Sequence, residues 1–174
     1  MKTKRDFIKE YNLSNAVPLD PSLKVLPAEG FALAIEDFIN ERFRGTAKAR
    51  ARVASYSGVL VSAEYVALFF KMLLAEIYGR CFLNISLSND NDNLTILIEP
   101  DSPLPIDDSQ MRSIIKAARN GGMKIYFEDD KIRLTLTFSD AAIRRVYAIS
   151  VIDGRNIMLA KLSEIFFCGE EYDS

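Results

Sequence analysis

The chain has 174 residues, with 22 Lys and Arg against 24 Asp and Glu, so its formal net charge is −2. Apolar residues make up 49% of the sequence, which is ordinary for a soluble globular domain. The sequence contains no histidine. This excludes Ser-His-Asp and Cys-His catalytic sites, histidine metal ligands and a phospho-accepting histidine within this chain.

The N-terminal and apolar segments indicate a cytoplasmic protein. Residues 1–11 are of mixed charge and lack the apolar core of a signal peptide. The longest apolar stretch, residues 65–78, is interrupted by Lys71 and Glu76 and is shorter than the roughly 20 residues that cross a bilayer. The two cysteines are too few for a disulfide framework or a zinc site. We therefore expect no membrane segment and no bound metal.

The first part of the chain predicts a short strand over residues 23–26, a helix over 28–46 and an extended segment over 53–61. The helix is predicted by apolar residues that recur three or four positions apart. These residues are Phe31, Ile35, Phe38 and Ile39.

A basic run lies between this helix and the extended segment. It consists of Arg42, Arg44, Lys48, Arg50 and Arg52. One interpretation is that these cations complement the C-terminal end of the helix and then lie on a solvated strand edge. The other is that they contact phosphate or an acidic partner. We favour the first, and the near-neutral total charge argues against a dedicated nucleic-acid binder.

The clearest helix begins at Ser62, which is a favourable N-cap, and stops near Gly79. Its residues are apolar on nearly every side, which predicts a central buried helix. Glu76 interrupts this pattern, and a buried carboxylate is costly unless it is paired or hydrogen-bonded. It either faces a residual pocket or reaches solvent or Arg80, four positions further on.

Two hairpins and a helix follow. Residues 81–88 alternate between polar and apolar and pair with 94–98 across a polar turn. A helix over 107–120 has Asp107, Asp108 and Ser109 as candidate caps and ends at a pair of glycines. Residues 123–127 and 132–138 form the second hairpin.

The C-terminal segment predicts two helices rather than a hairpin. Residues 146–152 are rich in β-branched side chains, so strand and helix both remain open there. Asp153-Gly154 is a turn signal, and residues 157–167 read as a helix. The complete order is β-α-β-α-β-β-α-β-β-α.

Three short sequence motifs can be placed on the predicted helices and strands. Met72–Ile77 reads MLLAEI on the buried helix, Asp101–Ile106 reads DSPLPI after the first hairpin, and Gly121–Phe138 holds the paired glycines and the closing hairpin. They resemble the ATP-binding domain of sensor histidine kinases, whose motifs commonly read N-L-L-S-N-A, D-N-G-P-G-I and G-G-x-I. This is the GHKL or Bergerat ATPase fold, shared with gyrase, the mismatch-repair ATPases and the heat-shock chaperone.

The resemblance implies an α/β fold, a two-layer sandwich with one face of a mixed, mostly antiparallel sheet covered by helices. We expect a single domain over residues 1–174. Residues 20–138 would form the kinase-like core and 139–174 a C-terminal helical extension. That extension would cover the sheet or form a homodimer contact.

The resemblance also indicates where a nucleotide pocket would lie. The asparagines that hold magnesium and phosphates in the family are matched by Met72 and Glu76, and the aspartate that binds the adenine amino group is matched by Asp101. A thioether offers a hard cation no oxygen. Pro103 and Pro105 replace the two glycines, and proline lacks an N–H donor. The glycine-rich lid is absent, so Asp101 and Glu76 are read as remnants of the pocket.

The sequence therefore predicts a degenerate, non-catalytic domain that uses no cofactor. We expect a regulatory protein-interaction module in bacterial signal transduction, with a protein partner, a possible homodimer, and no nucleic-acid or membrane binding. One alternative is an ATP-binding domain with a remodelled pocket, in which Asp101 reads adenine and Glu76 acts at magnesium or water. The other alternative is a sensor of a small ligand.

Overall fold

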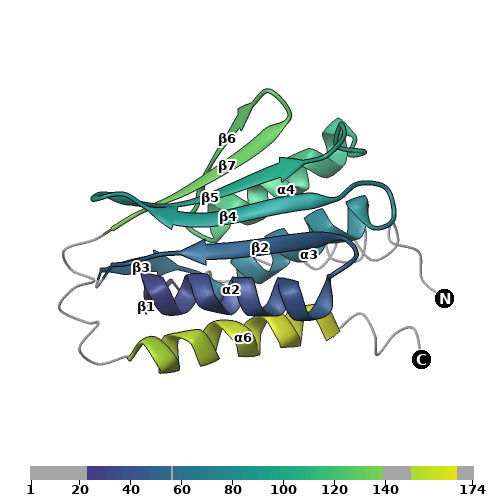
Figure 1. The fold of residues 1–174 in the computed structure, drawn as a ribbon. Coiled ribbons are helices and arrows are strands. Elements are labelled where there is room, and N and C mark those ends of the chain that lie inside the picture. Colours follow the sequence, from purple (N-terminus) through teal and green to yellow (C-terminus); the bar gives the residue numbers. More distant parts are fainter. Residues whose placement is uncertain (1–22, 56, 139–149, 168–174) are drawn as a thin grey trace.

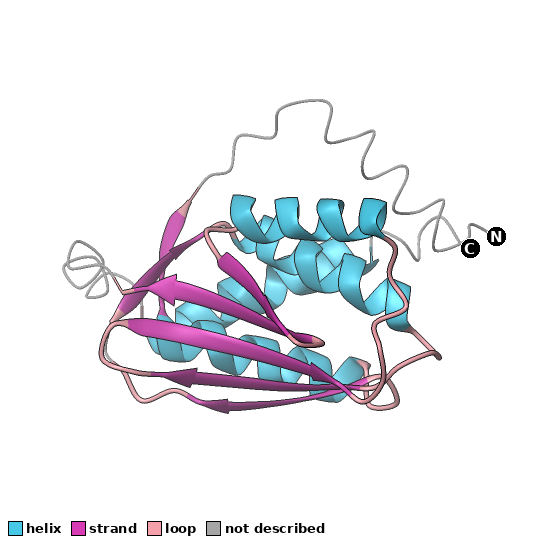
Figure 2. Ribbon diagram, turned by 90° about the horizontal axis from the view of Figure 1, so that it is seen from above, coloured by secondary structure: helices cyan, strands magenta, loops and turns pink. Residues whose placement is uncertain are grey.

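The computed structural model describes residues 23–55, 57–138 and 150–167, which form seven strands and four helices (Figures 1 and 2). In chain order they are β1 (Lys24–Pro27), α2 (Ala28–Arg42), β2 (Ala47–Arg52), β3 (Gly58–Val61), α3 (Ala63–Ile77), β4 (Leu83–Asn89), β5 (Asn93–Pro100), α4 (Asp108–Asn120), β6 (Lys124–Glu128), β7 (Lys131–Thr137) and α6 (Val151–Phe167).

The main sheet has five strands in the order β2-β4-β5-β7-β6. Strand β2 runs parallel to β4, and the other neighbours are antiparallel. The register aligns buried side chains across the strands, so that Ile85 lies opposite Ile98 and Ile98 opposite Ile132. A separate two-stranded antiparallel sheet joins β1 to β3. The predicted mixed, mostly antiparallel sheet is confirmed.

The two faces of the sheet differ because its strands alternate. On β4 the side chains of Leu83, Ile85 and Leu87 are buried, whereas the intervening polar side chains are exposed. The same alternation buries the apolar residues of β5 and β7. Each fully buried leucine or isoleucine contributes roughly 1.5–3 kcal/mol to folding. Figure 1 looks onto the open face of the sheet, with α3 and α4 behind the strands.

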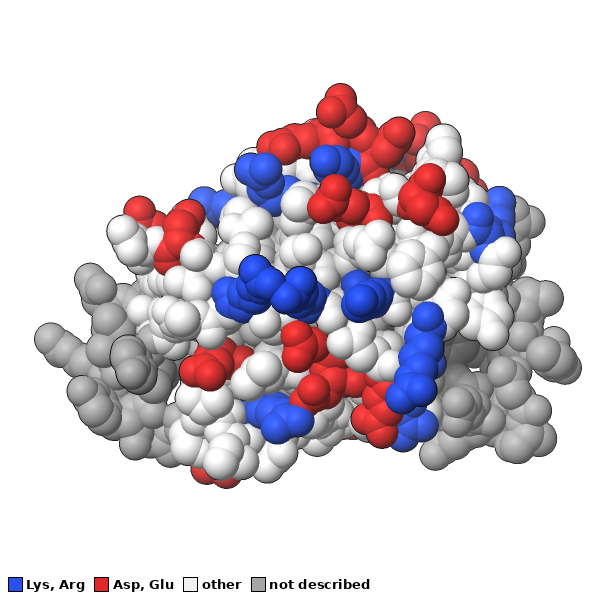
Figure 3. Space-filling model, viewed as in Figure 1, with Lys and Arg blue, Asp and Glu red and all other residues white. Residues whose placement is uncertain are grey.

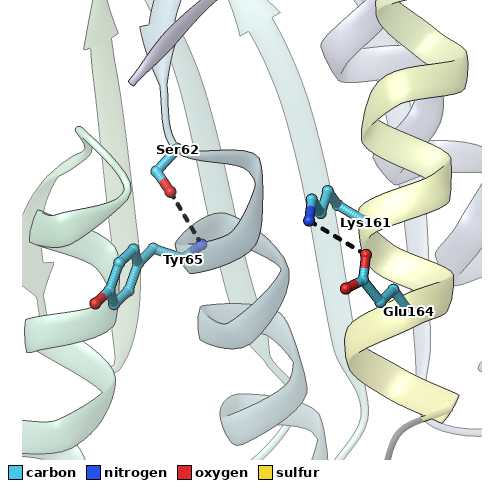
Figure 4. Close-up of polar contacts among 4 residues, drawn as sticks. All are labelled: Ser62, Tyr65, Lys161 and Glu164. Carbon is cyan, nitrogen blue, oxygen red and sulfur yellow. Dashed lines mark hydrogen bonds and ion pairs between the residues drawn. The ribbon is translucent and has the colours of Figure 1, made fainter. Parts of the chain in front are cut away.

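Helix α3 is the centre of the core, as its sequence predicts. Most of its residues are buried, since it packs between α4 and α6 behind the sheet. The Ser62 hydroxyl accepts a hydrogen bond from the Tyr65 amide at 3.4 Å and caps the helix (Figure 4). Lys71 is only 7% exposed, and its ammonium donates to the Ile165 carbonyl near the end of α6.

No helix in the described ranges is long and apolar enough to cross a membrane.

Helix α6 packs along α2 and α3, so it does not cover the open face of the sheet (Figure 1). At its C-terminal end the Phe166 ring lies 4.9 Å from that of Phe38 and 5.1 Å from that of Phe43. Nearer its start, the Arg155 guanidinium pairs with the Asp37 carboxylate of α2. Helix α6 is therefore attached to α2 and to the residue that follows it by aromatic and ionic contacts.

The prediction of a turn at Asp153-Gly154 is wrong, because both residues lie in the first turns of α6. The glycine serves close packing instead: a Cβ at Gly154 would lie 2.6 Å from Pro27 Cδ. Gly30 has the same role on α2, where a Cβ would lie 2.4 Å from the Val151 carbonyl oxygen. The helix begins at Val151 rather than at residue 157; residues 139–149, where the other helix or a strand was expected, lie outside the described residues.

The second correction concerns β2. The first helix ends at Arg42 instead of reaching residue 46, and β2 occupies residues 47–52, where no strand was predicted. Of the extended segment predicted over 53–61, residues 58–61 form β3, which belongs to the other sheet. Strand β2 reads AKARAR, so its inward positions are alanines, which give a weak apolar signal. Its cations are exposed, which agrees with the interpretation of a solvated strand edge.

Candidate functional site

The predicted pocket residue Asp101 lies directly after β5, next to the start of β4. Its Oδ1 atom accepts hydrogen bonds from the Phe82 amide at 2.9 Å, the Ser102 hydroxyl at 3.2 Å and the Cys81 thiol at 3.4 Å. The Asp101 amide in turn donates to the Phe82 carbonyl at 3.0 Å. The hydrogen bond from the Phe82 amide, followed by that from the Cys81 thiol, lowers the pKa of Asp101 below its ordinary value. Asp101 is therefore a carboxylate at neutral pH and ties β4 to β5.

The other predicted remnant, Glu76, lies on α3 one helical turn after Met72. The two side chains are 6% and 3% exposed respectively, so the interpretation in which Glu76 reaches solvent is wrong. The alternative partner, Arg80, instead donates from Nη1 to the Pro105 carbonyl at 3.4 Å. This contact and those of Asp101 bring the end of α3 beside the segment 101–105.

The segment after Asp101 is short and leads directly into α4. The Asp107 carboxylate accepts a hydrogen bond from the Gln110 amide at 2.7 Å. The Gln110 side-chain oxygen accepts one from the Asp107 amide at 3.1 Å, which completes a capping box. Of the three candidate caps, Asp107 is the one that the helix uses. Because a carboxylate already occupies it, the N-terminus of α4 presents negative charge to its surroundings.

The described surface carries, among others, three hollows whose linings include neither Asp101 nor Glu76. One, of about 120 Å³, lies between β1, the start of α3 and the middle of α6. Figure 4 shows its surroundings: Ser62 caps α3 on one side, and on the other the Lys161 ammonium pairs with the Glu164 carboxylate at 3.2 Å. The second, of about 380 Å³, lies beside β6, and the third, of about 220 Å³, lies over β2 and β4.

The part of the chain that the structure describes contains no cluster of metal ligands. No three Asp, Glu or Cys side chains come together there in an arrangement that could hold a metal ion.

Sequence reasoning missed two residues of α2 that bind the edge of β2. Asn40 makes two hydrogen bonds of 2.8 Å, donating from Nδ2 to the Ala49 carbonyl and accepting from the Ala49 amide. Glu36, one turn earlier, accepts from the Ala51 amide. Their spacing of four residues within an apolar helix was the available signal. These contacts occupy backbone groups of β2 that would otherwise be open to a further strand.

Comparisons with known proteins identify the fold. No protein-family model matches the sequence, and no curated protein matches it either. Among solved structures, the chain resembles the Acinetobacter baumannii histidine kinase AdeS with a TM-score of 0.51 and 12% identity, over 76% of this chain and 74% of that one. The cytoplasmic segment of histidine kinase QseC has a TM-score of 0.45 and 13% identity, over 78% and 91% of the two chains. The catalytic domain of histidine kinase ThkA has a TM-score of 0.45 and 8% identity, over 67% and 96%.

The described residues therefore adopt the histidine-kinase ATPase-like fold that the sequence motifs implied. At these levels of identity the likeness concerns the fold alone.

Proposed function

We propose that this chain is a histidine-kinase-like domain that does not bind ATP and that acts in signal transduction by contacting other proteins. The observation that carries the proposal is the hydrogen bonding of two carboxylates, Asp101 and Asp107, in the segment that the family uses to bind its nucleotide. Asp101 and Asp107 both accept hydrogen bonds from the chain's own backbone amides. One oxygen of the carboxylate matched to the adenine position is thus engaged within the fold, and so is an amide at the start of α4 that could otherwise face a phosphate.

Adenine recognition at Asp101 is restricted by the hydrogen bonds that one of its carboxylate oxygens already accepts. In the family that the motifs resemble, the matching carboxylate accepts a hydrogen bond from the adenine amino group. Here its Oδ1 atom, which has two lone pairs, already faces three donors. Adenine would therefore be restricted to Oδ2, because at Oδ1 it would have to compete with the contact that holds the Phe82 amide.

Phosphate binding is disfavoured by charge. A triphosphate is stabilised by free amides at a helix N-terminus and by nearby cations. The amides at the start of α4 are capped by Asp107, and Asp108 follows in the first turn. The sequence has no Lys or Arg between Arg80 and Arg112, and Arg80 donates to a backbone carbonyl. The local field would therefore repel a triphosphate.

Magnesium is not a plausible mediator with these side chains. At the two positions where the family places asparagines on this helix, the chain has Met72 and Glu76, both buried. The methionine sulfur is a poor ligand for a hard cation, which prefers oxygen. One buried carboxylate would have to supply the protein's share of the coordination from α3.

The proposal is tested by thermal unfolding with and without about 1 mM magnesium-ATP. A ligand that binds only the native state adds about 2.7 kcal/mol at 100 times its dissociation constant. For a domain of this size that corresponds to a rise in Tm of roughly 5–10 °C. We expect no rise.

A rise in Tm that Asp101→Asn abolishes would contradict the proposal and would favour the ATP-binding alternative. The matched control is Asp130→Asn, which removes the same charge from the exposed β6–β7 turn. This control variant must leave any nucleotide effect unchanged.

A further inference from the structure

The open face of the sheet carries a row of unneutralised cations along β2. Lys48, Arg50 and Arg52 alternate with alanines, and all three side chains are exposed; we refer to them as the β2 basic row. Among the described contacts none of the three takes part in an ion pair or a side-chain hydrogen bond. Figure 3 shows basic side chains in a line across the middle of this face, over β2.

Small polar side chains of β4 lie beside the row. The register places Arg50 directly opposite Ser86 and Arg52 directly opposite Ser88. These four residues, with Leu87, line the hollow of about 220 Å³ on this face. Guanidinium groups offer paired donors that match carboxylates, and hydroxyls add further donors. The hollow therefore suits negatively charged oxygen atoms.

In the described part of the chain, the unpaired cations of this face are concentrated on β2, and one further cation, Lys124, lies on β6. On β7, the Lys131 ammonium pairs with the Glu99 carboxylate at 3.2 Å, and the Arg133 guanidinium pairs with the Glu128 carboxylate at 3.1 Å. The cations of β7 are thus neutralised locally, whereas those of β2 are not. An acidic partner would gain charge complementarity at β2 and little elsewhere on this face.

The backbone of β2 is held in place from its outer edge. Asn40 binds the amide and carbonyl of Ala49, and Glu36 binds the amide of Ala51. A partner therefore has to use the side chains of the row rather than add a strand to the sheet. The same contacts fix the strand to α2, so the cations project from a rigid support.

We infer that the β2 basic row is a docking surface for an acidic protein segment in an extended conformation. Side chains at alternate positions of a strand are about 6.7 Å apart, and carboxylates at alternate positions of an extended peptide have the same spacing. The two sets of charges can therefore align along β2. A single-stranded nucleic acid fits less well, because its bases need aromatic stacking platforms, and the row and its β4 neighbours contain no aromatic side chain.

The test measures fluorescence anisotropy of a labelled peptide of about 12 residues, with glutamate and serine alternating, at about 50 mM salt. The variant Arg50→Glu/Arg52→Glu is compared with Arg112→Glu/Lys116→Glu, which changes the same charge on exposed positions of α4. We expect the β2 variant to weaken binding at least about tenfold and the α4 variant to change it less than about twofold. The neutral pair Arg50→Gln/Arg52→Gln should weaken binding by an intermediate factor, which keeps the test valid if the charge reversal impairs folding.

Three outcomes would overturn the inference. The wild-type protein could fail to bind the peptide at about 1 mM. The two reversed variants could lose equal affinity, which would indicate attraction by total charge alone. Finally, an oligothymidylate of matched length could bind more tightly than the peptide, which would assign the row to nucleic acid. Because the readout involves no nucleotide triphosphate, its result is independent of the test for ATP binding.

Discussion

The contact between α2 and α6 yields a prediction that runs against helix propensity. Replacing glycine by alanine inside a helix normally stabilises it by about 1 kcal/mol. At Gly30, however, the new Cβ would lie 2.4 Å from the Val151 carbonyl oxygen and 3.0 Å from the Arg155 amide nitrogen. Both are backbone atoms of α6, so the strain can be relieved only by moving one helix away from the other.

The expected net effect of Gly30→Ala is destabilisation. Overpacking of this kind costs typically 1–3 kcal/mol, and backbone neighbours at such a distance place the cost at the upper end. After subtraction of the propensity gain, we expect a loss of about 2 kcal/mol in the free energy of unfolding. This corresponds to a fall in Tm of roughly 4–8 °C, measured by thermal and urea unfolding.

The matched control is Gly45→Ala, where a Cβ would meet no atom within 4 Å. Gly45 is not in the left-handed backbone region, so alanine there should leave the stability unchanged or raise it slightly. If Gly30→Ala were as stable as the wild type, the close packing of α6 on α2 would be wrong. The interpretation of Gly154 as a packing glycine would fail with it.

Three further predictions concern hydrogen bonds that the chain makes to its own backbone. Because the pKa of Asp101 is lowered in the folded state, the carboxylate stabilises the fold above the ordinary carboxyl pKa, and this stabilisation is lost as the pH falls through the folded-state pKa. The difference in the free energy of unfolding between the wild type and Asp101→Asn should therefore shrink from pH 7 to about pH 3. Removing the cap with Asp107→Ala should cost about 1 kcal/mol in urea unfolding, and Asp130→Ala should cost almost nothing. Asn40→Ala removes both hydrogen bonds to Ala49 and should cost about 1–3 kcal/mol, with faster hydrogen exchange of the Ala49 amide.

Each of these three predictions has an outcome that would contradict it. An Asp101 difference that grows on acidification would mean that the carboxylate is destabilising when charged. Equal effects at Asp107 and Asp130 would contradict the capping box. Unchanged exchange at Ala49 in the Asn40 variant would mean that α2 does not protect the edge of β2.

Local chemistry made parts of the fold predictable from the sequence. Ser62 was identified as a helix cap, and Asp107 as one of three candidates, because capping depends on a side chain and amides only a few residues away. The alternation over β4 gave its buried face because period two is a property of the strand itself. The corresponding alternation in β2 was missed, since alanines fill its inward positions.

Long-range contacts account for what the sequence did not reveal. Gly154 resembles a turn residue, and only the approach of Pro27 and α2 explains why a glycine is needed within a helix. Similarly, the motif identified Asp101, but its hydrogen bonds to Phe82 and Cys81 depend on how β4 and β5 are brought together. Asn40 was overlooked for the same reason, because its partner on β2 is nine residues away along the chain.

The central claim is that the chain keeps the kinase-like fold without a nucleotide site, and titration calorimetry tests it most directly. ATP and ADP would be titrated into the wild-type protein with excess magnesium, up to about 1 mM nucleotide. The account predicts no saturable heat for either nucleotide. A saturating one-to-one curve that disappears in Asp101→Asn and persists in Asp130→Asn would contradict it, because it would show that the Asp101 carboxylate serves a bound nucleotide.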